Sequence, residues 1–75
     1  MNEDQLFAVV EFPDSNEVEA VPDLWLYENG RMCYWPPFKS TKKVTDAIKS
    51  MTAFEPNWLR YKSKVLQKYG QNMLD

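Results

Sequence analysis

The chain has 75 residues, of which 44% are hydrophobic and 15% aromatic, and its formal net charge is −2. These values exclude an intrinsically disordered chain, which carries few aromatic residues, and the length allows one small domain at most. The single cysteine and the lack of histidine exclude an internal disulfide and leave no ligand set of the usual zinc type.

The opening residues do not have the pattern of a targeting segment. Met-Asn-Glu-Asp-Gln is acidic, and no apolar run of the length that a signal peptide or a membrane span requires follows it. Catalysis needs a nucleophile beside a base, paired carboxylates in a cleft or a metal ion, and the sequence shows no such set. We therefore expect an intracellular, non-enzymatic protein without a cofactor, a small-molecule substrate or a membrane partner. We expect one domain over residues 1–75 with an ordered core at about residues 5–70, so that residues 1–4 and 71–75 lie outside it.

Residues 6–12 predict the first strand. Their sequence, Leu-Phe-Ala-Val-Val-Glu-Phe, is apolar at both alternating sets of positions, as expected of a strand that is covered on both faces. The run Pro-Asp-Ser-Asn at residues 13–16 predicts a turn, because proline fixes φ and because aspartate and asparagine side chains bond their own backbone.

Residues 17–21 alternate and predict a second strand. The apolar Val18 and Ala20 are expected to face the core, and Glu17 and Glu19 are expected to face solvent. Pro22 cannot donate to a ladder, so the run from Val21 to Asp23 predicts a bulge or a corner before the chain resumes at Leu24.

The strongest turn signal is Asn29-Gly30, which lies between two β-favouring runs in residues 24–38. Asparagine and glycine supply the two residues with positive φ that a two-residue type I′ hairpin turn needs. The resulting register places Glu28 opposite Arg31, Tyr27 opposite Met32, Leu26 opposite Cys33, Trp25 opposite Tyr34 and Leu24 opposite Trp35. One face then carries Leu24, Leu26, Cys33 and Trp35, and the other carries Trp25, Tyr27, Met32 and Tyr34. Because both faces are apolar, the hairpin is either covered twice or covered once and free to bind with its other face.

The second half of the chain predicts one helix and one more strand. Pro36-Pro37 ends the hairpin, and Ser40 or Thr41 caps a helix over about residues 41–51, whose apolar positions are Val44, Ala47, Ile48 and Met51. Residues 60–68 alternate and predict a fourth strand, while a helix over residues 58–69 remains the alternative. The predicted fold is α+β: a small twisted antiparallel sheet, SH3-like or related, built on the hairpin with the first strand beside it and one covering helix at about 41–51.

Several stretches share a pattern with known proteins: Phe-Ala-Val-Val-Glu-Phe at residues 7–12, Asn-Glu-Val-Glu-Ala-Val-Pro at 16–22 with Trp25-Leu26, Cys-Tyr-Trp-Pro-Pro at 33–37, and Trp58, Tyr61 and Val65-Leu66. Together they resemble the N-terminal module of a group of largely uncharacterised insect proteins that are linked to transposons or chromatin. The resemblance spans roughly residues 6–70 and implies a nuclear location, but no active site. The family pattern reads as a strand at the last segment, with valine where this chain has Ser63. Residues 14–21 are also similar to the middle strands of Tudor and other SH3-like barrels.

The charge is divided along the chain. Residues 1–38 contain eight acidic residues and one basic residue, a net −7, whereas residues 39–70 contain eight basic and two acidic residues, a net +6. This split describes either solvated faces or opposed patches that bind a protein partner or another copy of the chain. Lys42, Lys43, Lys62 and Lys64 are the candidate phosphate contacts if the basic half binds nucleic acid instead.

The aromatic residues of the hairpin have two interpretations. Trp25, Tyr27, Tyr34 and Trp35, with nearby acids such as Glu17 and Glu19, predict a cage for a methylated lysine or a groove for a proline-rich peptide. Alternatively the rings form the core, with Trp25, Trp35 and Trp58 buried. Cys33 has no histidine to activate it, and we expect it to pack as a buried apolar residue. The function predicted from the sequence is a protein-interaction module of a nuclear, chromatin-associated protein, with DNA binding as the alternative; the candidate partner-binding residues are Trp25, Tyr27, Tyr34, Glu17 and Glu19.

Overall fold

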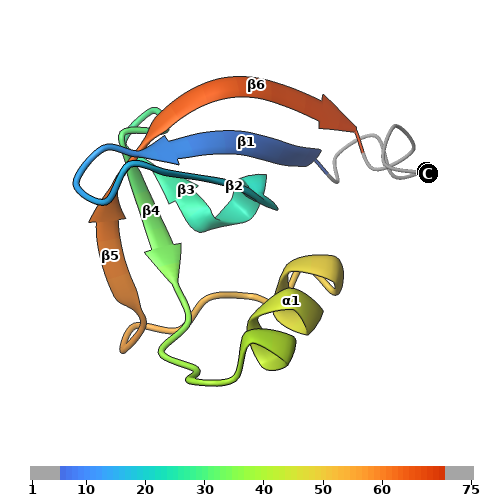
Figure 1. Ribbon diagram of the computed structural model, residues 1–75. Helices are drawn as coiled ribbons and strands as arrows, with labels where there is room; N and C mark the ends of the chain where they lie inside the picture. The colour runs from blue at the N-terminus through green and yellow to red at the C-terminus, as the bar shows by residue number, and fades with distance from the viewer. Residues whose placement is uncertain (1–5, 71–75) are drawn as a thin grey trace.

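The computed structural model of the protein describes residues 6–70. Residues 1–4 and 71–75, which we expect outside the ordered core, lie outside the described residues. In chain order the elements are β1 (Leu6–Phe12), β2 (Glu17–Pro22), the 3₁₀ helix η1 (Asp23–Trp25), β3 (Leu26–Tyr27), β4 (Met32–Trp35), α1 (Thr41–Lys49), β5 (Leu59–Lys62) and β6 (Lys64–Gly70). The strands form two three-stranded antiparallel sheets, in the orders β2-β1-β6 and β3-β4-β5. The α+β class with one helix is thus confirmed, and Figure 1 shows β4 running from the first sheet toward the end of the molecule that holds α1, and β5 running back beside it.

The first sheet is centred on β1. Ala8, Val10 and Phe12 are buried on its inner face, and on the other face Phe7 is buried and Val9 is half-buried. This confirms that the first strand is apolar and covered at both alternating sets of positions. The prediction that it lies beside the hairpin is wrong, because β1 pairs with β2 on one side and β6 on the other.

The orientation predicted for the second strand is also wrong. Phe12 is the Cα partner of Glu17, Val10 of Glu19 and Ala8 of Val21, so the two glutamates share the inner face with the buried valine. Val18 instead points outward and is 56% exposed. The inner face of β2 is buried only at its Val21 end. Glu17 and Glu19 lie at the other end, so they face inward but remain exposed to solvent.

The hairpin forms at Asn29-Gly30. Tyr27 pairs with Met32 and Leu26 with Cys33, which confirms the predicted register for these two pairs. Asn29 and Gly30 have φ of 59° and 81°, and the Arg31 amide donates to the Glu28 carbonyl, as in a type I′ turn. The preceding Glu28 is also left-handed, with φ of 51°, so the ladder ends at Tyr27 and the predicted pair Glu28–Arg31 is absent from it.

The ladder does not continue to Trp25, which is the second difference from the predicted hairpin. Pro22 ends β2 and precedes the 3₁₀ turn Asp23–Trp25, so the predicted corner at residues 21–23 is confirmed. The turn rotates Trp25 out of strand alternation and into the core, where it has no exposed surface. The pairs Trp25–Tyr34 and Leu24–Trp35 are therefore absent from the ladder.

The C-terminal segment is extended, so the predicted strand is confirmed and the helical alternative is wrong. It divides at Ser63 into β5, which pairs with β4, and β6, which pairs with β1, so this one residue carries the chain from the second sheet to the first. Ser63 is buried, and its amide donates to the Arg31 carbonyl at 2.8 Å. A register shift in β6 opposite Val9 and Val10 leaves Leu66 outside the pairing, as in a bulge.

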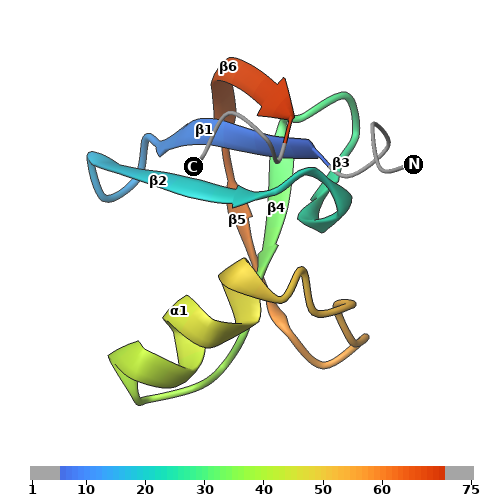
Figure 2. The same ribbon diagram turned by 90° about the vertical axis from the view of Figure 1, so that its right-hand side faces the viewer.

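α1 lies at one end of the molecule (Figure 2) and contacts β2. The Ser40 hydroxyl accepts from the Lys43 amide at 3.3 Å, which confirms the predicted cap. The helix ends at Lys49, and Met51 takes φ of 51° while the Met51 and Thr52 amides bond the carbonyls of Ile48 and Ala47, as in a Schellman motif. The predicted apolar positions face the sheets: Ala47 is buried, and Val44, Ile48 and Met51 are half-buried.

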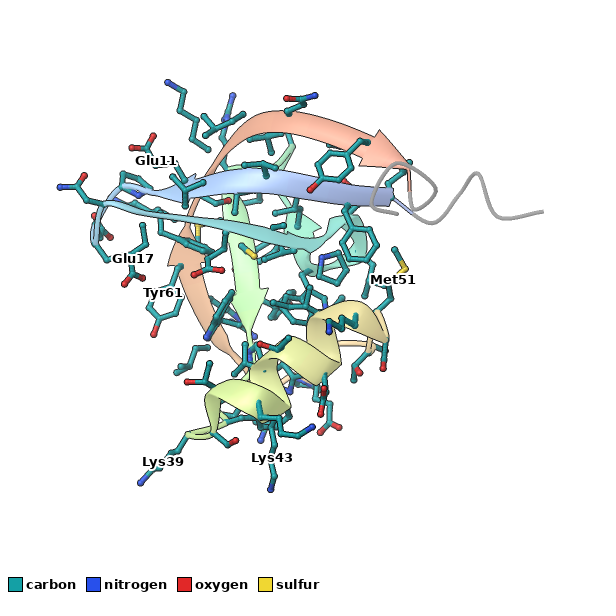
Figure 3. All side chains as sticks on the ribbon, turned by 45° about the vertical axis from the view of Figure 1, so that its right-hand side comes forward. Glu11, Glu17, Lys39, Lys43, Met51 and Tyr61 are labelled. Carbon is teal, nitrogen blue, oxygen red and sulfur yellow. The ribbon has the colours of Figure 1, made fainter. Side chains whose placement is uncertain are left out.

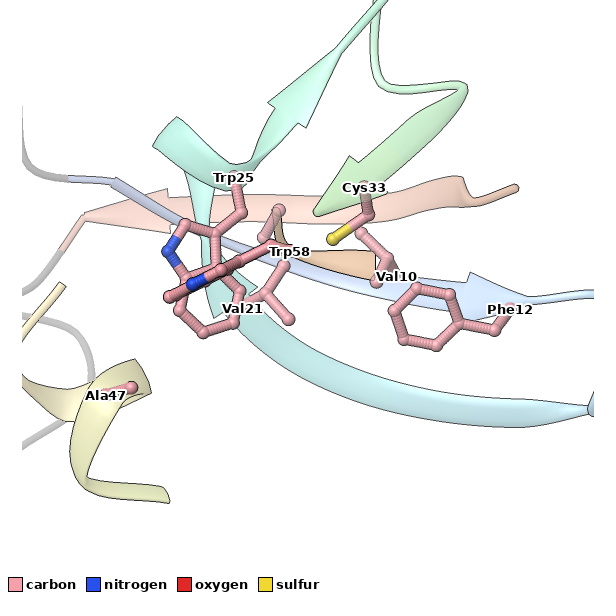
Figure 4. Close-up of a cluster of buried hydrophobic side chains, with 8 residues drawn as sticks. Val10, Phe12, Val21, Trp25, Cys33, Ala47 and Trp58 are labelled. Carbon is pink, nitrogen blue, oxygen red and sulfur yellow. The ribbon is translucent and has the colours of Figure 1, made fainter. Parts of the chain in front are cut away.

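One hydrophobic cluster joins the two sheets and the helix. Its buried members are Ala8, Val10, Phe12, Val21, Trp25, Cys33, Ala47 and Trp58. Figure 4 shows Trp25 and Trp58 together beside Val21; their ring centroids are 5.1 Å apart and their planes nearly perpendicular. Two of the three tryptophans are thus buried as predicted, whereas Trp35 is only half-buried at the border of the cluster.

Candidate partner-binding site

A hollow of about 260 Å³ opens between the two sheets, beneath the turn that joins β1 to β2. Three aromatic rings line it: Phe12 from β1, Trp35 from β4 and Tyr61 from β5. The Phe12 ring lies 5.6 Å from that of Trp35 and 6.1 Å from that of Tyr61, with interplanar angles of 82° and 72°. Each neighbour thus meets Phe12 edge to face rather than in a flat stack, and all three rings border the hollow.

The hollow is also acidic. Asp14, Glu17 and Glu19 line it with the rings, and Figure 3 shows Glu17 and Tyr61 under the same turn. The Ser15 hydroxyl donates to the Glu17 carboxylate at 3.3 Å. Lys62 is the one cation among the lining residues, so three carboxylates against one ammonium give a net charge of −2. Among the described residues neither Glu17 nor Glu19 has an ion-pair partner. We call this site the acidic hollow.

The structure divides the predicted partner-binding residues among three places. Glu17 and Glu19 enter the acidic hollow. Trp25 is fully buried, and its indole Nε1–H donates to the Thr52 carbonyl at 2.7 Å, so it does not join the tyrosines of the hairpin. The predicted grouping is wrong at this residue, because η1 replaces the strand that would have aligned Trp25 with Tyr34.

Tyr27 and Tyr34 lie on the opposite face of the β3-β4-β5 sheet from Cys33 and Trp35. Their ring centroids are 4.8 Å apart, and Phe54 stacks on Tyr34 at 4.0 Å with nearly parallel planes. The Arg60 guanidinium carbon lies 5.4 Å from the Tyr34 centroid. These rings contact one another, and Arg60 lies beside Tyr34, so they form a packed stack on this face of the sheet.

The candidate phosphate-binding lysines do not form one surface. Lys42 and Lys43 lie in the first turn of α1, and Lys42 pairs with Asp46 at 3.3 Å. Figure 3 shows Lys39 and Lys43 projecting from this end of the helix, away from the sheets. Lys62 and Lys64 flank Ser63 at the junction of β5 and β6, which Figures 1 and 2 place at the other end of the molecule, and Lys62 lines the acidic hollow.

Cys33 is a packing residue, as expected. It is fully buried, and its thiol donates to the Tyr34 carbonyl at 3.2 Å. Burial raises the pKa of this thiol from 9.0 to about 12, so the reactive thiolate is disfavoured. Within residues 6–70 no three His, Cys, Asp or Glu side chains are arranged to hold a metal ion, and no helix is long and apolar enough to cross a membrane.

Sequence reasoning missed two of the three rings of the acidic hollow and placed the third in a different group. Phe12 and Tyr61 come from strands that are 49 positions apart, and the sequence gives no sign that the chain returns at β5 to pair with β4. A usable signal did exist on β2: Val21 precedes the corner and must face the core, which places Glu19 and Glu17 on the inner face by alternation.

Comparison with protein-family models, curated proteins and solved structures returned no match to this chain. The resemblance to the insect module and the SH3-like arrangement therefore stay predictions from the sequence.

Proposed function

We propose that the protein is a non-enzymatic interaction module of a nuclear, chromatin-associated protein, and that it binds a protein partner through the acidic hollow. The carrying observation is the meeting of Phe12, Trp35 and Tyr61 with three carboxylates in one concavity. Tyr61 is 43% exposed and Glu17 and Glu19 are exposed, so a partner has direct access. The nuclear setting rests on the family resemblance alone.

The chemistry of the hollow favours a positively charged partner. Carboxylates at its rim attract basic side chains and repel acidic ones, which contributes to specificity and to the association rate. A volume of about 260 Å³ is below the range typical of sites for drug-sized ligands, so the hollow suits one side chain of a peptide rather than a metabolite.

The test is a nuclear magnetic resonance titration of the isotopically labelled protein with a short lysine-rich peptide and, separately, with a glutamate-rich peptide of the same length. We expect the lysine-rich peptide to shift the Trp35 indole and Tyr61 signals and the glutamate-rich peptide to shift neither. The Trp25 indole signal is an internal reference, because this ring is buried and its N–H is hydrogen-bonded to the Thr52 carbonyl. Equal shifts with both peptides, or none with either, would contradict the proposal.

The rival function, DNA binding by Lys42, Lys43, Lys62 and Lys64, is tested with duplex DNA in the same experiment. Phosphate binding releases counterions, so this rival requires signal changes around the lysines that disappear steeply as salt rises. Because the two lysine pairs lie at opposite ends of the molecule, we expect no such binding. Self-association is tested by sedimentation at rising protein concentration. An apparent molecular mass that increases with concentration in the wild type, but not when Lys42 and Lys43 are changed to Glu, would identify the partner as a second copy.

A further inference from the structure

We infer that the acidic hollow binds the side chain of a methylated lysine that keeps at least one N–H, that is, a mono- or dimethyllysine of the partner protein. This inference rests on the proposed function and names the ligand of the same site.

The rings account for the attraction to a methylated ammonium. A cation within about 6 Å of a ring centroid is attracted by the negative face of the ring, by about 0.5–2 kcal/mol depending on how dry the site is. Phe12, Trp35 and Tyr61 all line the hollow, where Phe12 is 6% exposed and Tyr61 43%, so a cation that enters lies close to three rings.

The same rings disfavour an unmodified lysine. Its ammonium is compact and strongly hydrated and has three N–H donors, whereas ring faces replace few of the hydrogen bonds that water provides. Each methyl group removes one donor and adds apolar surface that packs on the rings. Methylation therefore lowers the cost of dehydration while the positive charge is kept.

The carboxylates account for the preference for a retained N–H. Glu17 and Glu19 project from alternate positions of β2 into the hollow and have no cationic partner among residues 6–70. A charge-assisted hydrogen bond from the ligand to such a carboxylate is stronger than one between neutral groups. A trimethylated ammonium has no N–H to donate, so it gains the ring contacts but not this bond.

The Tyr27, Tyr34 and Phe54 stack does not offer the same site. Phe54 lies at 4.0 Å over the Tyr34 ring, and Arg60 already supplies a cation there. This surface therefore provides the matched control for ring substitutions.

The experiment uses one short peptide in four forms, in which a single central lysine carries zero, one, two or three methyl groups, together with dimethylammonium chloride as the smallest probe. Binding to the labelled protein is followed through the Trp35 indole and Tyr61 signals. We expect the dimethyllysine form to bind about tenfold more tightly than the unmodified form, and the trimethylated form to bind more weakly than the dimethylated one. Dimethylammonium should shift the same signals at high concentration.

Two pairs of variants locate the binding. Tyr61→Ala should abolish the preference for methylated forms, whereas Phe54→Ala, at a ring of similar exposure in the surface stack, should leave it unchanged. Glu17→Gln with Glu19→Gln should weaken the dimethylated form more than the trimethylated form. Glu28→Gln, at an exposed carboxylate outside the hollow, is the control. All five positions are exposed, so the four variants are expected to fold, which thermal unfolding verifies.

Equal affinity for all four peptides would overturn the inference but leave the proposed function standing, because a site for any basic side chain behaves in this way. Tightest binding of the trimethylated peptide would overturn the role given to the carboxylates and with it the inference. Loss of the methyl preference in Phe54→Ala rather than in Tyr61→Ala would move the ligand to the ring stack and overturn it as well. Failure of the proposed function is distinguishable, since it requires that the lysine-rich and glutamate-rich peptides behave alike.

Discussion

The Ser63 hydroxyl donates a hydrogen bond of 2.7 Å to the Gly30 carbonyl, across 33 positions of the sequence. Together with the bond from the Ser63 amide to the Arg31 carbonyl, it ties the corner between β5 and β6 to the tip of the β3–β4 hairpin. The point where the chain changes sheets is thus held by the turn that the sequence identifies most clearly.

Removal of the Ser63 hydroxyl should therefore destabilise the protein. Ser63→Ala leaves a carbonyl in a part-buried position without its partner, and we expect the free energy of unfolding to fall by about 1–3 kcal/mol. Ser63→Val should cost at least as much, because it adds bulk at a buried position. Urea unfolding measures both. Ser15→Ala, at an exposed serine, is the control, and an equal effect there would contradict this account of the corner.

Gly30 is required for two independent reasons. Its φ of 81° is unfavourable for residues with a side chain, and a Cβ at this position would lie 2.6 Å from Cγ2 of Val65. We expect Gly30→Ala to lower the free energy of unfolding by about 2 kcal/mol or more. Gly70→Ala is the matched control, since a Cβ there meets nothing within 4 Å, and thermal unfolding of the two variants should differ clearly. Similar melting temperatures would show that the hairpin tip adapts.

Trp25 and Trp35 should differ in their contributions to stability. Trp25→Ala removes a fully buried ring and its bond to Thr52, and we expect a loss of about 3–5 kcal/mol, which approaches the whole stability of a domain this small. The sequence alone suggests the same cost for Trp35→Ala, but Trp35 is half-buried on the wall of the hollow, so we now expect a smaller loss. Urea unfolding measures both losses. A larger loss for Trp35→Ala than for Trp25→Ala would show that Trp35, and not Trp25, is the main core residue.

The stability should depend on pH through Cys33 above pH 9. Burial raises the pKa of the folded thiol from 9.0 to about 12, so between these values the unfolded chain loses the proton and the folded chain keeps it. The resulting contribution to stability is complete below pH 9 and falls by about 1.4 kcal/mol per pH unit as the pH rises toward 12. Cys33→Ala should show a shallower fall, and the difference between the two proteins cancels ionisations that they share. Parallel curves would contradict the shift.

The hairpin shows how far the sequence predicts this fold. Asn29-Gly30 specifies its own backbone geometry, so the turn and the two nearest pairs follow from local chemistry. Trp25 lies only four positions away, but its place is decided by the corner at Pro22 and by contact with Trp58, which local patterns do not contain. The acidic hollow depends on such distant contacts throughout, because its rings come from three strands in two sheets.

The glutamates of β2 have a further consequence, for solubility. β2 is an edge strand of its sheet in the described part of the chain, and such edges present unpaired amide and carbonyl groups on which another chain can add a strand. Val18, Ala20 and Val21 would make an aggregation-prone run if valines replaced their acidic neighbours. The inward-facing charges of Glu17 and Glu19 oppose the addition of a strand at this edge, because the added strand would have to bury them. A carboxylate at Glu17 or Glu19 is thus favoured whether or not the acidic hollow binds a ligand, and a chain with valine at both positions should precipitate before it unfolds.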